Sequence, residues 1–301
     1  MYDVIRSNRA DARRETFQVD PSMQVRCITL NVSSLAQSID FYQSVLGFVK
    51  VGKSSSDRAF LSTEGSSANL VELRQVKANP SSATKRAGLY HFAILLPERK
   101  FLADMLRNLR SKRDLMRFDG LADHLVSESI YIRDPDLIGI EIYSDRPRTE
   151  WNWDGRQIEM STLPLNTDNL LQESTERGWK HMPSKTRIGH VHLHVNDLSK
   201  AVRFYHEILG LNLTATIAGA AFFAAGKYHH HIAANTWLGH SIAPASSESI
   251  GLNYFTLELT NEDEYAKLWK QLSKHGRVDE STDSSCFIRD MDGVRIQIQH
   301  N

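Results

Sequence analysis

Alternating hydrophobic and polar residues open two long stretches of the chain that resemble each other. Residues 28–48 and residues 191–211 begin 163 positions apart and share seven identical residues. In each copy the alternating run predicts a strand, and apolar residues at three-to-four spacing closed by a glycine predict a helix. A second similar pair, residues 88–96 and 251–259, lies at the same offset. One offset shared by two different segments indicates an internal duplication.

Short strand candidates separated by Gly, Ser and Asn follow each predicted helix, so the order β-α-β-β-β is expected four times. We therefore predict an α+β fold with two consecutive domains of two modules each, at residues 23–146 and 187–301. Residues 147–186 are expected to be a linker with a helix near residues 168–176. Residues 1–22 are expected to be an N-terminal arm.

Charge and composition exclude several classes of protein. The 36 basic and 36 acidic residues give no formal net charge, which argues against a nucleic-acid-binding surface. No apolar run is as long as a membrane span, and the N-terminus lacks the apolar core of a signal peptide. Two cysteines cannot form a disulfide framework. We expect a cytoplasmic protein without nucleic-acid or membrane partners.

Two motifs make the pattern specific. The helices read Phe-Tyr-x-x-x-Leu-Gly at residues 41–47 and 204–210, and the segment from Asp134 to Glu141 reads Asp-Pro-Asp-x-x-Gly-Ile-Glu. With four βαβββ modules, they resemble the vicinal oxygen chelate superfamily (glyoxalases, bleomycin resistance proteins and extradiol dioxygenases), most closely the type I extradiol catechol 2,3-dioxygenases. The resemblance covers residues 25–145 and 187–300. It implies two glyoxalase-like domains with curled, mixed sheets around a metal-binding cavity.

Inward positions on the first and last strand of each module are the candidate metal ligands. They are Cys27, His91, His190 and Tyr254 on the first strands, and Glu72, Glu141, a residue near His229–His231 and Gln297 on the last strands. Only His91, His190 and Glu141 supply two imidazoles and a carboxylate, the facial triad of non-haem Fe(II) oxygenases. Using Cys27 in place of His190 would put an oxidisable thiolate beside O₂. We predict Fe(II), or Mn(II), between the second and third modules.

The resemblance also implies catalytic residues. Tyr131 lies ten residues before Glu141, where the extradiol enzymes have a tyrosine that hydrogen-bonds a substrate oxygen. The stretch 228–235 resembles their His-rich last strand, and His230 is the best match to the acid–base histidine. Strand parity equally allows His229 or His231. His124 is a further candidate, although its spacing departs from the family pattern by a couple of residues.

The resemblance thus implies a homo-oligomeric enzyme that opens a catechol-like aromatic diol with O₂. Two alternatives remain open. A glyoxalase-type metal-dependent lyase or isomerase would want a second Glu where this chain offers histidine. A metal-free small-molecule binding or resistance protein would have no use for both the triad and its neighbours. One departure is Leu137-Ile138, where the family often has Gly-Asn, which leaves the geometry of that turn open.

Overall fold

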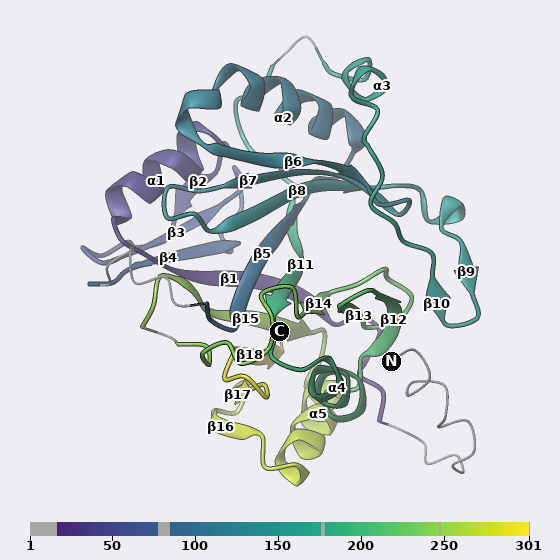
Figure 1. Cartoon of the computed structure of the whole chain (residues 1–301). Helices are drawn as coiled ribbons and strands as arrows, with labels where there is room; N and C mark the ends of the chain where they lie inside the picture. Colours follow the sequence, from purple (N-terminus) through teal and green to yellow (C-terminus); the bar gives the residue numbers. More distant parts are fainter. Residues whose placement is uncertain (1–16, 78–84, 176–177, 247, 301) are drawn as a thin grey trace.

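The computed structural model describes residues 17–77, 85–175, 178–246 and 248–300, and it contains the four βαβββ modules that the sequence predicts (Figure 1). The first consists of β1 (Gln24–Val32), α1 (Leu35–Ser44), β2 (Val49–Val51), β3 (Arg58–Ser62) and β4 (Val71–Gln75). The second consists of β5 (Gly88–Leu95), α2 (Arg99–Ser111), the short η1 (Arg113–Leu115), β6 (Arg117–Asp123), β7 (Ser127–Arg133) and β8 (Gly139–Asp145).

The second half of the chain repeats this order. The third module consists of β11 (Arg187–His194), α4 (Leu198–Val202), the π-helix η3 (Arg203–Ile208), β12 (Asn212–Ile217), β13 (Ala220–Ala224) and β14 (Ile232–Asn235). The fourth consists of β15 (Gly251–Leu259), α5 (Glu262–Lys274), β16 (Val278–Ser281), β17 (Ser285–Arg289) and β18 (Arg295–His300). The α+β fold of four βαβββ modules is therefore confirmed.

The connection between the halves is mostly irregular. It contains η2 (Arg148–Glu150), β9 (Trp153–Asp154), β10 (Gln157–Ile158) and α3 (Thr167–Leu171). The helix α3 begins where the sequence predicts it, capped by the side chain of Asn166, but it ends earlier than predicted. Most of the predicted N-terminal arm, residues 1–16, lies outside the described residues. Within the described part of the chain, no helix has the length and apolar character needed to cross a membrane.

Each of two eight-stranded sheets takes one module from each half of the chain. The β1 sheet has the order β16-β17-β18-β15-β1-β4-β3-β2, and the β5 sheet has the order β12-β13-β14-β11-β5-β8-β7-β6. In both, the two central strands are antiparallel, and each has a parallel neighbour, so the sheets are mixed. The predicted domains therefore describe the repeat in the sequence, whereas the sheets join module one with four and module two with three.

Side chains alternate between the two faces of β5 and β11, so one face of these strands packs in the core and the other faces the site. Phe92 and Ile94 of β5, and Val191 and Leu193 of β11, are fully buried in the hydrophobic core that also contains residues of α1, α2 and α5. Because neighbouring side chains on a strand point to opposite faces, the residues between them face away from this core. The histidines and the carboxylate that the sequence singles out belong to that second set.

The repeated tyrosine of the helix motif connects neighbouring modules. Tyr42 donates a hydrogen bond to Asp134 at 3.3 Å, and Tyr205 donates one to Asp290 at 2.7 Å, so each helix is tied to the turn before a last strand. In the first of these turns Leu137 has a left-handed φ of 62°. In the second turn the corresponding residue is Gly293, with a φ of 88°. The unusual Leu137 therefore keeps the turn conformation and accepts a backbone strain that glycine avoids.

Candidate functional site

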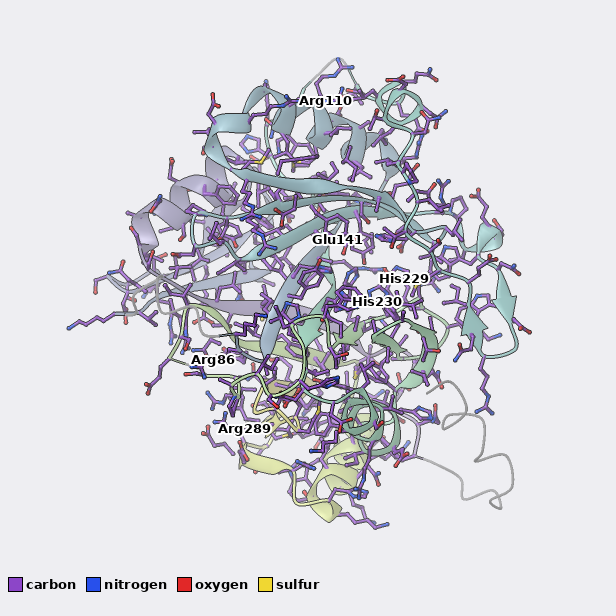
Figure 2. All side chains as sticks on the ribbon, viewed as in Figure 1. Arg86, Arg110, Glu141, His229, His230 and Arg289 are labelled. Atoms are coloured by element: carbon purple, nitrogen blue, oxygen red, sulfur yellow. The ribbon has the colours of Figure 1, made fainter. Side chains whose placement is uncertain are left out.

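A cavity of about 620 Å³ lies on the polar face of the β5 sheet. Figure 2 shows Glu141, His229 and His230 near the centre of the molecule, in the region of this cavity. The lining combines metal-ligand side chains with aromatic and apolar ones. The lining includes Tyr90, His91, Leu121, His124, Val126, Tyr131, Glu141, Met160, Ser161, His190, His192, Phe222, His230 and Trp237.

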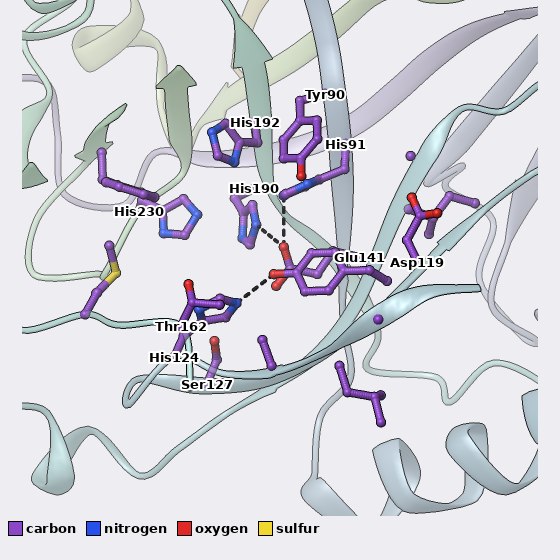
Figure 3. Close-up of a pocket in the computed structure, with 18 of the residues that line it drawn as sticks. Tyr90, His91, Asp119, His124, Ser127, Glu141, Thr162, His190, His192 and His230 are labelled. Carbon is purple, nitrogen blue, oxygen red and sulfur yellow. Dashed lines mark hydrogen bonds and ion pairs between the residues drawn. The ribbon is translucent and has the colours of Figure 1, made fainter. Parts of the chain in front are cut away.

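His91, Glu141 and His190 converge at the base of the cavity (Figure 3). The Nε2 atoms of His91 and His190 lie 2.9 and 3.0 Å from the same atom, Oε2 of Glu141, and all three ligand atoms lie within 4.8 Å of one another. Ligands that are about 2.1 Å from an octahedral metal ion are themselves about 3 Å apart. The three side chains are buried, and their donor atoms have the spacing that one divalent ion requires.

Close packing positions His190. The pairing of β11 with β5 shifts register between Ile188 and His190, a bulge of the kind that redirects a side chain next to an active site. Gly189 lies between them, and a Cβ atom there would be 1.8 Å from the hydroxyl of Tyr143. Only glycine fits at this position, and the Tyr143 ring then packs against the His190 ring with centroids 5.0 Å apart.

The electrostatics of the three residues suit a cation. Burial lowers the pKa values of His91 and His190, so both imidazoles are kept neutral, as metal ligands must be. Burial alone would raise the pKa of Glu141, but its close contacts with His190 and His91 hold that pKa well below its usual range. Ser129 also donates a hydrogen bond of 2.6 Å to Oε1 of Glu141. A buried carboxylate between two neutral donors leaves a net negative site.

The position in the third module that is equivalent to Glu141, and that could supply a fourth metal ligand, has no donor atom. On β8, Glu141 lies beside Ala93 of β5, and the equivalent pair in the third module is Ala233 of β14 beside His192 of β11. Ala233 is therefore the counterpart of Glu141. The expectation that this counterpart lies near His229–His231 is wrong, because the strand begins only after the three histidines and its inward position comes later.

The three consecutive histidines have different environments. His230 lines the cavity, and its ring centroid is 4.0 Å from that of His190. Burial lowers the pKa of His230 well below its usual value. His229 is buried outside the cavity lining, and His231 accepts a hydrogen bond from the backbone N–H of Ala225. Of the alternatives that the sequence left open, the structure places His230 in the cavity.

Tyr131 and His124 form a hydrogen-bonded pair on the cavity wall (Figure 3). The hydroxyl of Tyr131 is 2.7 Å from Nε2 of His124, and Nδ1 of His124 is 2.7 Å from the backbone oxygen of Ser161. A carbonyl oxygen only accepts, so the His124 proton is on Nδ1, and Tyr131 donates to Nε2. Burial raises the pKa of Tyr131 well above its usual value, which keeps this hydroxyl protonated.

Sequence reasoning missed Ser129, Tyr90 and Trp237 in the site. Ser129 precedes Tyr131 by two residues on β7 and so shares its inward face, a signal that the sequence did contain. Tyr90, His192 and Trp237 form an aromatic wall, with ring centroids between 5.1 and 5.5 Å apart. The position of Trp237 after β14 could not be inferred locally, because the wall forms only when β11 pairs with β5.

Comparisons with known proteins agree with this architecture. The model of the Glyoxalase/Bleomycin resistance protein/Dioxygenase superfamily matches residues 24–142 and 187–298. A protein of Bacillus subtilis (strain 168) named Catechol-2,3-dioxygenase is 38% identical over 269 residues, which cover 87% of this chain and 91% of that protein.

Solved structures show the same fold at low sequence identity. A putative dioxygenase from Bacillus subtilis subsp. subtilis str. 168 has a TM-score of 0.60 and 12% identity, covering 94% of this chain and 86% of that one. Glyoxalase I from Zea mays has a TM-score of 0.55 and 14% identity, covering 93% and 92%. The duplicated modules, the two matched segments and the relative of nearly equal length agree: this chain belongs to the glyoxalase/bleomycin resistance protein/dioxygenase superfamily.

Proposed function

We propose that the protein is an extradiol dioxygenase that opens a catechol-like aromatic diol with O₂ at a non-haem Fe(II) site. The observation that carries the proposal is the donor set: His91, His190 and Glu141 converge, and Ala233 stands where a fourth ligand would be. Two imidazoles and one carboxylate with open positions are the facial triad of Fe(II) oxygenases. The relative named Catechol-2,3-dioxygenase supports the same reaction class.

The donor set also suits the substrate. Fe(II) bound here would take both diol oxygens and O₂ in its open positions and relay electrons from the aromatic ring to O₂. Two neutral imidazoles and one carboxylate leave such a site with one net positive charge, which favours a diol that has lost a proton. The buried triad lines the cavity, so the substrate would reach the metal from the cavity side.

Three side chains would handle protons and hydrogen bonds around the substrate. His230 would accept a proton from a diol hydroxyl and return it to the oxygen that leaves later, a general acid–base role. Tyr131 would place its hydroxyl against a substrate oxygen, and His124 would hold Tyr131 in position through its bond to Ser161. On substrate binding, the Tyr131 hydroxyl would turn its proton from His124 toward that oxygen and so stabilise the charge that develops on it.

The cavity walls indicate the kind of diol. Apolar side chains of Leu121, Val126 and Met160 contribute to the lining together with the aromatic wall, and the volume far exceeds one benzene ring. We propose a catechol that carries an apolar or second aromatic substituent, because such a group would fill the cavity and displace water from it.

The two alternatives are weaker. A glyoxalase-type lyase or isomerase needs a further basic carboxylate, and the position that could supply it is Ala233. A metal-free binding protein would leave Glu141 buried without a cation, and such a group is costly unless it is paired. Neither alternative function explains the hydrogen-bonded pair of Tyr131 and His124.

The test is anaerobic reconstitution with Fe(II), followed by exposure to O₂ with catechol, methylcatechol and a biphenyl diol. We expect stoichiometric O₂ uptake, a yellow ring-opened product and faster turnover of the larger diols. Parallel samples loaded with Mn(II) or Zn(II) test the identity of the metal, and a glutathione hemithioacetal tests glyoxalase activity. A protein that holds iron but consumes no O₂ with any of the diols would refute the proposal.

A further inference from the structure

A chain of hydrogen bonds runs from His230 away from the cavity. Nδ1 of His230 lies 2.7 Å from Nδ1 of His229, and Nε2 of His229 lies 3.0 Å from Oδ1 of Asp145. His229 has no exposed surface, whereas the side chain of Asp145 is 22% exposed. Neither His229 nor Asp145 lines the cavity. The proposed reaction gives neither residue a direct role.

The chemistry of the three groups determines where the protons are. An ionised carboxylate only accepts hydrogen bonds, so Nε2 of His229 carries a proton and donates it to Asp145. A neutral imidazole carries one proton, which makes Nδ1 of His229 an acceptor. The short contact between the two Nδ1 atoms then requires His230 to donate from its own Nδ1. Its other nitrogen, Nε2, is left with a free lone pair.

We propose that Asp145, acting through His229, is a positioning residue that holds His230 in the tautomer with the proton on Nδ1 and a free Nε2 toward the cavity. The effect on turnover rests on the proposed function, whereas the tautomer is a property of the protein alone. A histidine with the opposite tautomer would present an N–H to the diol and could not accept its proton.

The fold gives this chain a fixed geometry. Asp145 is four residues after Glu141 on β8, so one strand provides both the carboxylate of the triad and the carboxylate behind the base. The rings of Trp151 and Tyr228 pack against His229, with centroids 5.4 and 4.1 Å away. This packing leaves the His229 ring few alternative orientations, so the hydrogen bond to Asp145 fixes which nitrogen of His229 faces His230. Figure 3 shows the His230 ring directed toward the triad.

Nitrogen-15 NMR of the metal-free protein tests the tautomer directly. At a slightly alkaline pH, we expect the Nε2 resonance of His230 to have the chemical shift of an unprotonated ring nitrogen. The variant His230→Gln assigns the resonance by its disappearance. A protonated Nε2 in the wild-type protein would overturn the proposal, whatever the reaction of the metal-loaded enzyme proves to be.

The variant Asp145→Ala removes the acceptor at the end of the chain. We expect the Nε2-protonated form of His230 to appear, and kcat of the Fe(II)-loaded enzyme to fall by about 100-fold with KM changed much less, since a positioned base contributes about 10²–10⁴-fold. The matched control is Tyr228→Phe, which removes the other hydrogen bond to Oδ1 of Asp145, 3.2 Å long, and should keep the wild-type tautomer. An unchanged His230 spectrum in folded Asp145→Ala would also refute the assignment.

Discussion

The two eight-stranded sheets have the same strand order, yet only one of them gathers metal ligands. In the β5 sheet the inward positions hold two imidazoles and a carboxylate whose partners are neutral. The positions equivalent to His91, His190 and Glu141 in the β1 sheet are Tyr254, Cys27 and Gln297. The backbone arrangement is therefore shared, and the difference between the sheets lies in the charge and the donor atoms of a few side chains.

The polar residues of the β1 sheet satisfy one another. Cys27 donates to Thr256 at 3.4 Å, and Thr256 donates to Gln297 at 3.0 Å. The buried Glu72 contacts two guanidinium groups, at 2.7 Å to Arg74 and 3.1 Å to Arg58. Its negative charge is already compensated by the protein. A buried carboxylate becomes available for a metal only where, as at Glu141, its neighbours are neutral.

Equivalent aromatic substitutions in the two sheets should have opposite consequences. His91→Phe removes a ligand, and we expect at least about a 100-fold loss of metal affinity, beyond the 10–100-fold typical of outer-shell changes. Tyr254→Phe changes the equivalent residue of the β1 sheet and should leave metal binding intact. Competition with a metal chelator measures both. Equal losses in the two variants would mean that the metal is not bound where the β5 sheet brings its ligands together.

The carboxylate of Glu72, which is paired with two arginines, should affect the stability of the protein and not its metal binding. Arg74→Ala leaves the buried Glu72 with Arg58 as its remaining close cation, and we expect the free energy of unfolding to fall by about 2 kcal/mol. Urea denaturation measures the loss, and metal content should not change. The double variant Arg74→Ala/Glu72→Gln should recover part of the stability, because it removes the buried charge that Arg58 alone compensates only in part. No recovery would show that the lost stability comes from Arg74 packing.

The turns before the last strands should give the two sheets different pH dependence. Burial raises the pKa of Asp134 to about 7 and that of Asp290 to about 6. The native state then keeps protons that the unfolded state has released, so stability falls as pH rises from about 4 to about 7 and is flat above it. Asp134→Asn should remove the loss of stability that continues up to about pH 7. Asp290→Asn should remove the loss of stability that ends near pH 6. Denaturation curves of wild type and variants at several pH values measure this, and identical slopes would contradict it.

The smallest expected difference concerns the backbone of the same two turns. Leu137 and Gly293 both have left-handed φ angles, and Leu137 is 57% exposed, so its side chain contributes little burial. Leu137→Gly should stabilise the protein by about 1 kcal/mol, since a non-glycine residue costs about 1–2 kcal/mol in this conformation. Gly293→Ala should destabilise it by a similar amount. Thermal unfolding of both variants tests the pair, and a destabilising Leu137→Gly would mean that the side chain has a packing role.

Much of the site could be found in the sequence because its signals are local. Alternation placed His91, His190 and Glu141 on the faces opposite Phe92, Val191 and Ile140, and the structure has them there. The same period, applied to β7, would also have found Ser129 beside Tyr131. These inferences need only the direction of neighbouring side chains along one strand.

Other features depend on which strands pair and in what register. Parity alone allowed any of three histidines to face the cavity, and the folded chain has His230 there. The pairing of β11 with β14 puts Ala233 at the position equivalent to Glu141. Asp145 approaches His229 only because β8 and the segment before β14 meet, although they are 84 positions apart.

The amino-acid sequence by itself determined the four modules, the face of each strand and the types of donor atoms, because hydrophobic periodicity is read over a few residues. The types of donor atoms already predicted that His91 and Glu141 meet His190, but only the tertiary structure decided that one continuous sheet joins module two with three, and another module one with four. That choice depends on contacts between strands far apart in the chain, which no local pattern encodes.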